Sequence, residues 1–224
     1  MCGRFTRGEN IPTLAREFGV VQVNSDLAPS YNIAPTQEVA VIVTAGVKTL
    51  LPVRWGLIPS WAKDMSVGSK MINARAETIS EKPAYRNAFK KRRCLVVADG
   101  FYEWQSIAGV KRPIHIRFKS GRPFGFAGLY EVWNSPAGEE ITTCTIITTQ
   151  ANELMSPIHE RMPVIIPKEQ EDLWLDPKTE EQSLLLSLLK PYPADQMEAY
   201  PVSKKVSSPK NNSPDCRARL RVNA

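Results

Sequence analysis

The spacing of hydrophobic and polar positions changes several times along the chain, and each change predicts a different element. Ile11, Leu14 and Phe18 recur at helical spacing and the pattern stops at Gly19, which predicts a short helix. Three further segments are predicted to be helical: 81–93, 167–175 and 178–190. Segments rich in β-branched and aromatic residues predict strands: 38–46, 48–58, 71–78, 94–104, 112–120, 124–133, 141–149 and 199–206.

The order of these elements predicts the fold class. Strands outnumber helices and rarely alternate with them, so we expect an α+β fold. Specifically, we expect a single domain with a mostly antiparallel, barrel-like β-sheet and flanking helices. A chain of 224 residues is long enough for one such domain. We assign residues 1–206 to the domain and treat 207–224 as a basic C-terminal segment of unknown role.

The net charge of +6 is unevenly distributed along the chain. From residue 203 to the end there are six basic residues and one acid, a balance of +5, so residues 1–202 carry only +1. Overall basicity therefore does not indicate a nucleic-acid partner. The clearest local cluster, Lys90 to Arg93, is as typical of a solvated helix end as of a binding patch.

Several classes of protein are excluded by composition. The chain does not begin with a secretory signal, and its apolar runs are too short to span a bilayer, so we expect a cytoplasmic protein without membrane contact. Cys2, Cys94, Cys144 and Cys216 form no close pair, which argues against a disulfide framework and a zinc ribbon. We expect no metal and no cofactor, and we expect Cys94 and Cys144 to be buried in strands.

Polar residues interrupt the pattern first in the segment 71–78. A period of two places Asn73, Arg75 and Glu77 on one face of the expected strand, with small apolar residues behind them. Such a face either lines a cleft or forms a plain solvent-facing edge, and the pattern is compatible with both.

A second interruption follows the strand that begins at residue 94. Asp99-Gly100 predicts a turn or bulge, after which Glu103 lies among aromatic residues. Partial burial would raise the pKa of the Glu103 carboxyl and suit it to act as both acid and base. A surface glutamate fits the pattern equally well.

The chain has two histidines, and two of its tryptophans flank a Gly/Pro loop. His115 lies in an alternating run and is predicted to be structural, whereas His159 follows a proline-containing bend and is better placed for catalysis. Trp55 and Trp61 have the setting of residues that stack on nucleobases, although both would also fit the core.

Seven short motifs then occur in order along the chain. They are MCGRF, YNIAPTQ, RWGLIPSWAKD, INARAET, CLVVADGFYEW, SPIHERMPV and YPVSKKV. Together they resemble the successive motifs of the SOS-response-associated peptidase (SRAP) family, the abasic-site processing proteins. The resemblance runs from residue 1 to about residue 212, and the segment from residue 215 matches least.

The resemblance implies a DNA-repair protein of the SOS response that binds single-stranded DNA and couples covalently to abasic sites. Its partner would be abasic single-stranded DNA, and we expect a monomer that associates with the nucleoid when bound. Cys2 would be the nucleophile, Glu103 would catalyse the linkage, and Asn73 and His159 would orient the opened sugar.

The resemblance also implies a DNA-binding surface. Arg4 and Arg75 would bind phosphates, which adds affinity for DNA without a preference for its sequence. Trp55 and Trp61 would belong to the same surface.

A cysteine at position two has a specific chemical use once Met1 is removed. The exposed α-amine, with a pKa of about 7.7–8.0, is partly neutral near pH 7 and can attack the aldehyde of an open abasic sugar. The neighbouring thiol can then add to the Schiff base and close a thiazolidine ring, which prevents strand cleavage by β-elimination. An internal cysteine cannot do this, because its nitrogen is an amide.

Two other functions stay open on the sequence alone. Cys2 with His159 and either Asn73 or Glu103 could support a thiol peptidase that acts on other proteins or only exposes Cys2 itself. A non-covalent single-strand binding module, in which Cys2 is merely a small residue at a frayed end, is the third interpretation.

Overall fold

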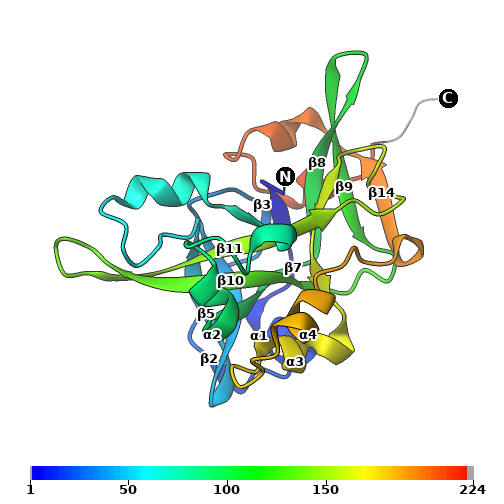
Figure 1. Cartoon of the computed structure of the whole chain (residues 1–224). Helices are drawn as coiled ribbons and strands as arrows, with labels where there is room; N and C mark the ends of the chain where they lie inside the picture. Colours follow the sequence, from blue (N-terminus) through cyan, green and yellow to red (C-terminus); the bar gives the residue numbers. More distant parts are fainter. Residues whose placement is uncertain (1, 221–224) are drawn as a thin grey trace.

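A closed five-stranded barrel forms the centre of the computed structural model, which describes residues 2–220 (Figure 1). Its strands are β4 (Glu38–Ala45), β5 (Val47–Trp55), β7 (Arg93–Ala98), β10 (Phe124–Asn134) and β11 (Glu140–Gln150). The pairs from β5 through β4, β7 and β10 to β11 are antiparallel. The barrel closes where β11 pairs in parallel with β5, at Cys144 and Trp55.

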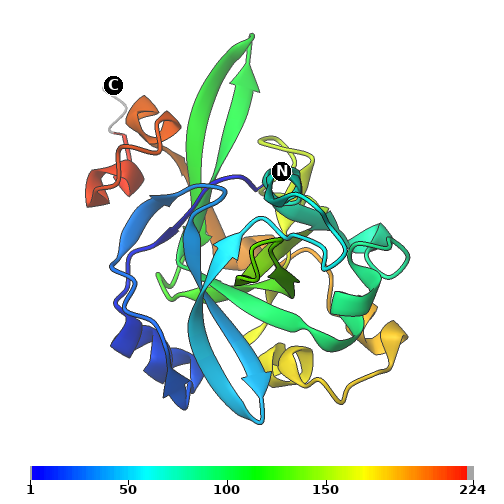
Figure 2. The same cartoon turned by 90° about the vertical axis from the view of Figure 1, so that its left-hand side faces the viewer.

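A second, fully antiparallel sheet lies beside the barrel. Its strands, in spatial order, are β14 (Met197–Pro201), β9 (Val110–Phe118), β8 (Gly100–Ile107), β1 (Phe5–Arg7) and β3 (Ser30–Ile33). The β8–β9 hairpin extends beyond the rest of the molecule (Figure 2). The chain passes from the barrel into this sheet at Asp99, so the predicted break between Ala98 and Gly100 is confirmed.

Four short strands complete the sheets. They are β2 (Gln22–Val23), β6 (Asn73–Arg75), β12 (Arg161–Pro163) and β13 (Ile165–Ile166). Strands β6 and β12 both pair with β11 beyond the point where β5 and β10 leave it. The prediction of an α+β domain with a mostly antiparallel, barrel-like sheet is confirmed.

The helices are few and short. They are α1 (Ile11–Phe18), α2 (Arg86–Lys91), α3 (Glu171–Leu175) and α4 (Gln182–Ser187). Helix α1 matches the prediction, because Asn10 caps its start and Gly19 ends it at a φ of 62°. In Figure 1, α1, α3 and α4 lie together on the side of the barrel away from the start of the chain.

Several predicted elements are wrong in their extent. The helix predicted over 178–190 covers only α4, and the strand predicted over 199–206 ends at Pro201, before a 3-10 turn over Lys204–Ser207. The helix predicted over 81–93 covers only α2, since residue 93 already pairs with Leu129 in the barrel. The strand predicted over 71–78 is limited to β6, and a 3-10 turn over Ala76–Thr78 follows. Glu77 therefore does not continue the face that Asn73 and Arg75 share.

Two hydrophobic clusters lie on opposite faces of the barrel wall. In β4, Val39 and Val41 belong to one cluster, whereas Ala40 and Ile42 belong to the other. The second cluster packs against the helices; the first contains Cys2, Phe5 and Trp55. Burial on both faces explains why β4 reads as a continuous apolar run.

The residues after β14 fold back onto the second sheet. Cys216 is buried with Tyr102, Tyr200 and Val206, and Arg217 forms an ion pair of 3.1 Å with Asp99. Residues 221–224 lie outside the described residues. The predicted basic C-terminal segment is thus in contact with the domain over the part that the structure describes.

His115 has the structural role that its sequence pattern predicts. The imidazole is buried, and its Nδ1 lies 3.0 Å from the hydroxyl of Tyr200, which also donates to the carbonyl of Arg217. Burial lowers the pKa of His115 to about 3, so the ring stays neutral and belongs to the contact between β9 and the C-terminal residues.

Candidate active site and DNA-facing surface

Strand pairing brings Cys2 to Glu103. Strand β1 pairs with β8 at Phe5 and Phe101, and the amide of Tyr102 donates to the carbonyl of Arg4 at 2.9 Å. If this antiparallel register continues, the two residues before Arg4 lie beside Glu103 and beside the residue that follows Glu103. Burial first, and the Glu103 carboxylate second, raise the pKa of the Cys2 thiol well above its usual value. The thiol is therefore protonated near neutral pH.

Strand β11 connects Asn73 to the segment that carries His159. Asn73 pairs in parallel with Ile146, while β12, which begins two residues after His159, pairs with β11 at residues 148–150. Arg161 joins the two regions, because its guanidinium binds both carboxylate oxygens of Glu77, at 2.7 and 2.9 Å. Glu77 thus has a structural partner across the site.

The loop over residues 151–160 also contacts the second sheet. Gln105, two residues beyond Glu103 on the same face of β8, donates to the carbonyl of Pro157 at 3.1 Å. The residues directly before Asn73 and His159, Ile72 and Ile158, pack on the hydrophobic cluster that contains Cys2. The structure therefore brings the four predicted catalytic residues into one region: Cys2, Asn73, Glu103 and His159.

Glu103 combines burial with an altered proton affinity. Its side chain is only 4% exposed, and this burial raises the pKa of the carboxyl from 4.5 to about 7. A group with this pKa is present in both protonation states near pH 7, so it can donate and accept a proton in successive steps.

We expect Glu103→Gln to change how the free energy of unfolding depends on pH. Between pH 4.5 and 7 the unfolded chain releases the Glu103 proton while the folded chain retains it, so the wild type loses stability as pH rises through this window. The loss is about 3 kcal/mol in total. Glutamine has no such proton, so the variant should gain stability relative to wild type by roughly this amount between pH 4.5 and 8.

Denaturant unfolding at a series of pH values measures this difference. Glu180→Gln, at an exposed glutamate, is the matched control and should show no comparable trend. A constant difference between wild type and Glu103→Gln across the window would contradict the burial effect.

His159 is oriented by the backbone. Its Nδ1 accepts a hydrogen bond from the amide of Arg161 at 3.0 Å, which puts the proton of the neutral ring on Nε2. Burial lowers the pKa of His159 below its ordinary 6.5, so the neutral form dominates at pH 7. The ring is suited to donate a hydrogen bond from Nε2 to an oxygen of a bound molecule.

Asn73 has an oriented amide. Its Nδ2 donates to the carbonyls of Ile72 at 3.0 Å and Ile146 at 3.5 Å, which fixes which side of the amide carries the oxygen. Oδ1 is buried and has no hydrogen-bond partner among residues 2–220. A buried acceptor of this kind is suited to receive a hydroxyl proton from a ligand.

Arg4 contacts residues that the sequence pattern does not single out. Its Nη1 donates to Oδ1 of Asn32 and to the carbonyl of Val206, both at 2.8 Å, and the guanidinium lies 5.8 Å from the centre of the Trp104 ring. The only sequence signal for Asn32 is its place in the YNIAPTQ motif. The Asn32 amide donates to backbone carbonyls more than 170 positions away, and no local sequence pattern encodes such contacts.

The other predicted DNA-facing residues differ in exposure. Arg75 is exposed on β6, and Trp61 is 67% exposed. The expectation that Trp55 faces DNA is wrong, because the side chain is fully buried in the barrel. Its ring packs edge-on against Phe5 at 5.1 Å, and Nε1 donates to the carbonyl of Ile72 at 2.9 Å.

The basic cluster from Lys90 to Arg93 is partly structural. Arg93 is buried, and its guanidinium donates to backbone carbonyls within α2 and at the end of α3, including Phe89 at 2.9 Å and Trp174 at 2.8 Å. Arg92 is paired with Glu131 at 2.7 Å. Only the two lysines of the cluster are exposed and free of such pairs within the described chain.

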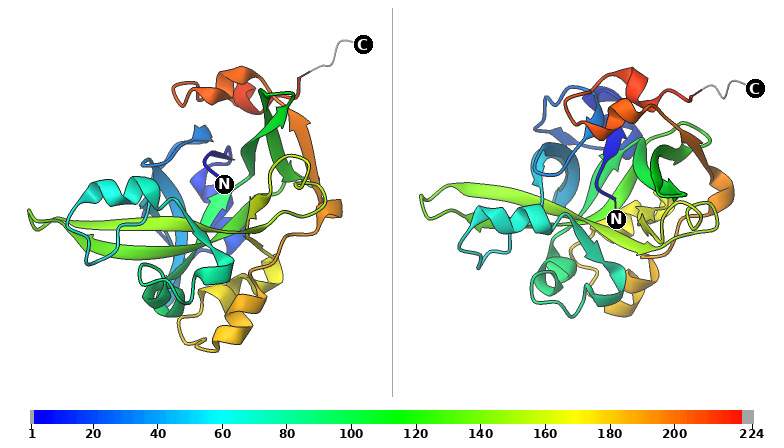
Figure 3. Two further views of the ribbon diagram at one scale, coloured as in Figure 1. Left: turned by 45° about the horizontal axis from the view of Figure 1, so that its top comes forward. Right: turned by 90° about the horizontal axis from the view of Figure 1, so that it is seen from above.

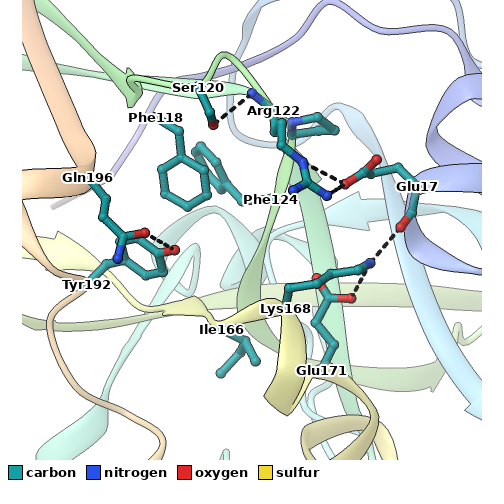
Figure 4. Close-up of a pocket in the computed structure, with 11 residues that line it drawn as sticks. Glu17, Phe118, Ser120, Arg122, Phe124, Ile166, Lys168, Glu171, Tyr192 and Gln196 are labelled. Carbon is teal, nitrogen blue, oxygen red and sulfur yellow. Dashed lines mark hydrogen bonds and ion pairs between the residues drawn. The ribbon is translucent and has the colours of Figure 1, made fainter.

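A separate hollow of about 260 Å³ lies beside the end of β9 (Figure 4). Phe118 and Tyr192 stack in its wall at 4.6 Å, and its charged residues pair with one another, as Arg122 with Glu17 and Lys168 with Glu171. It contains none of the predicted site residues, and its charges are already satisfied, so we assign it no role.

Two other features are absent from residues 2–220. No group of three or more His, Cys, Asp or Glu side chains is arranged to hold a metal ion. No helix there is both long enough and apolar enough to cross a membrane.

The chain matches the family model described as "SOS response associated peptidase (SRAP)" over residues 1–209. The chain belongs to the SRAP family. It is 52% identical to the abasic site processing protein YoqW of Bacillus subtilis, over 96% of this chain and 98% of that protein. It is 33% identical to the abasic site processing protein HMCES of Gallus gallus, over 84% of this chain and 65% of that protein.

A solved structure has the same fold along nearly the whole chain. The fold is similar to the crystal structure of a protein from Bacteroides thetaiotaomicron, with a TM-score of 0.90 and 31% sequence identity. The similarity covers 98% of this chain and all of that one. The fold is thus shared with a solved structure along nearly the whole chain.

Proposed function

We propose that this protein processes abasic sites in single-stranded DNA by forming a covalent thiazolidine link through Cys2. The observation that carries the proposal is the convergence of a buried Cys2 thiol with a glutamate whose pKa is raised to about 7, in a chain 52% identical to an abasic site processing protein. Removal of Met1 is part of the proposal and concerns a residue outside the described ones. The removal could be performed by an aminopeptidase or by the site itself.

The reaction begins at the α-amine of Cys2. The amine attacks the sugar aldehyde to give a carbinolamine, which loses one water to form a C=N bond. The thiol then adds across that bond, so that a C–S bond forms and the S–H proton ends on nitrogen. The sum is aldehyde plus cysteine giving thiazolidine plus water, with no oxidant or reductant required.

Glu103 and His159 serve the proton transfers of this sequence. Loss of water needs an acid, and thiol addition needs a base because the raised pKa of Cys2 keeps the sulfur protonated. Glu103, with a pKa of about 7, can perform both in turn. His159 would donate from Nε2 to the ring-opened sugar, and Asn73 Oδ1 would accept from a sugar hydroxyl.

Binding would depend on the DNA backbone, since an abasic nucleotide has no base edge to read. Arg4 still has Nη2 available beyond its two protein contacts through Nη1, and Arg75 is exposed on the strand of Asn73. Trp61 offers an exposed ring for a neighbouring base. Affinity should therefore fall as salt rises.

Incubation with an abasic single-stranded oligonucleotide tests the proposal. We expect an adduct that survives denaturing electrophoresis, forms faster than with the same abasic site in a duplex, and leaves the DNA strand intact. Formation of no adduct, together with turnover of denatured proteins, would instead support the peptidase alternative.

A further inference from the structure

The segment after β14 is fixed to the start of the chain by buried polar contacts. Asn32, 1% exposed, donates through Nδ2 to the carbonyls of Val206 at 3.1 Å, Ser208 at 3.0 Å and Asn211 at 2.7 Å. One buried amide thus binds three backbone carbonyls within residues 206–211. We call residues 203–217 the C-terminal strap.

The strap lies directly beside the residues that surround Cys2. Arg4 donates to the carbonyl of Val206 at 2.8 Å, and Nε1 of Trp104 lies 3.3 Å from the hydroxyl of Ser207. The start of the chain and the C-terminal strap occupy the same side of the molecule (Figure 3). A DNA strand that reaches Cys2 past Arg4 would therefore run close to the turn over Lys204–Ser207.

The cations of this region divide into two groups. Arg217 and Arg219 are committed to ion pairs, with Asp99 at 3.1 Å and with Glu198 at 2.7 Å. Lys204, Lys205 and Lys210 are exposed, and none of them forms an ion pair with any of residues 2–220. Of these three, only Lys204 and Lys205 lie in the turn whose Val206 carbonyl binds Arg4. The only acid of the strap is Asp215, ten positions further along the chain.

We propose that Lys204 and Lys205 extend the DNA-binding surface by binding phosphates of the single strand that flanks the abasic nucleotide. The inference rests on the function proposed above and adds a partner-binding site to it. The strap supplies a rigid backbone from which two flexible cationic side chains reach the strand. Lysine acts there as a point charge, so the contact contributes affinity without sequence preference and without a part in the chemistry.

The double variant Lys204→Gln/Lys205→Gln tests this assignment. For an unmodified single-stranded oligonucleotide, each lost phosphate contact should reduce the slope of log K against log salt by about 0.7, so two reduce it by about 1.4. At 0.1 M salt we expect the Kd to rise roughly tenfold. The rate of adduct formation at saturating abasic DNA should stay close to that of wild type.

Lys178→Gln/Lys190→Gln is the matched control, because it removes the same charge from exposed positions next to α4, on the other side of the barrel. This variant should keep the wild-type slope. If Lys204→Gln/Lys205→Gln binds like the control while wild type binds DNA, the strap assignment alone is wrong. If wild type itself fails to bind the oligonucleotide, the proposed function is wrong as well.

Discussion

Cys2→Ala should form no adduct with abasic single-stranded DNA that survives denaturation, although it should still bind the DNA. The reason is that the α-amine of alanine can form only a Schiff base, which hydrolyses, whereas the cysteine thiol closes a ring intramolecularly. Denaturing electrophoresis after incubation with a labelled abasic oligonucleotide measures the loss. A stable adduct with Cys2→Ala would contradict the thiazolidine.

Two further variants make this result specific to position two. Cys2→Ser should give a transient imine that borohydride traps, because the amine is retained while sulfur is lost. Cys144→Ala removes another fully buried thiol, located in barrel strand β11, and should cross-link like wild type. Loss of adduct in Cys144→Ala would point to a general effect on folding.

Glu103→Gln should slow adduct formation by about 10²–10⁴-fold, the usual contribution of a positioned acid–base group. Glutamine keeps the shape and a hydrogen-bonding side chain but transfers no proton. The rate at saturating DNA, measured by quenching the reaction at timed intervals, is the relevant quantity, since DNA affinity should change little. A rate within a few-fold of wild type would contradict the role of Glu103.

The pH dependence separates Glu103 from its neighbours. The wild-type rate should change with an apparent pKa near 7, because burial raises the Glu103 pKa to about this value. In Glu103→Gln that step should disappear. His159→Gln should slow the reaction while retaining the step, because its hydrogen-bonding role does not depend on the Glu103 proton.

Elements with strong local signals could be predicted from the sequence. The α1 helix has a polar cap at Asn10 and a left-handed glycine at its end, and the β4–β5 hairpin turns at Gly46 with a φ of 87°. Both depend on residues within a few positions of each other. The closure of the barrel by a parallel β5–β11 pair does not, because its partners lie nearly ninety positions apart.

The alternation of polar and apolar residues gives a wrong prediction where a long-range contact determines the backbone conformation. The polar period over 71–78 suggests a strand that continues to Glu77, but Glu77 instead turns away to bind Arg161. Trp55 shows the same limitation, since a tryptophan beside a Gly/Pro loop has one sequence pattern whether its ring points outward or into the barrel. Only the packing against Phe5 distinguishes the two.

The sequence identifies the catalytic candidates but not the contacts that hold the residues around them. Cys2, Asn73, Glu103 and His159 lie in recognisable motifs, and the structure brings their segments together. The contacts of Arg4 and Asn32 are with backbone carbonyls of the strap, and a carbonyl has no residue-specific pattern. The position of the strap beside Cys2 therefore emerges only from the folded chain.

Intact-mass analysis of the purified protein, before and after exposure to an abasic single-stranded oligonucleotide, tests the central claim most directly. We predict that the purified chain begins at Cys2. After exposure, the mass of the product should equal the mass of that chain plus the mass of the intact oligonucleotide minus one water. Peptide mapping should locate the bond at residue 2. Cross-linking by protein that still carries Met1, or a bond on any other side chain, would contradict the account.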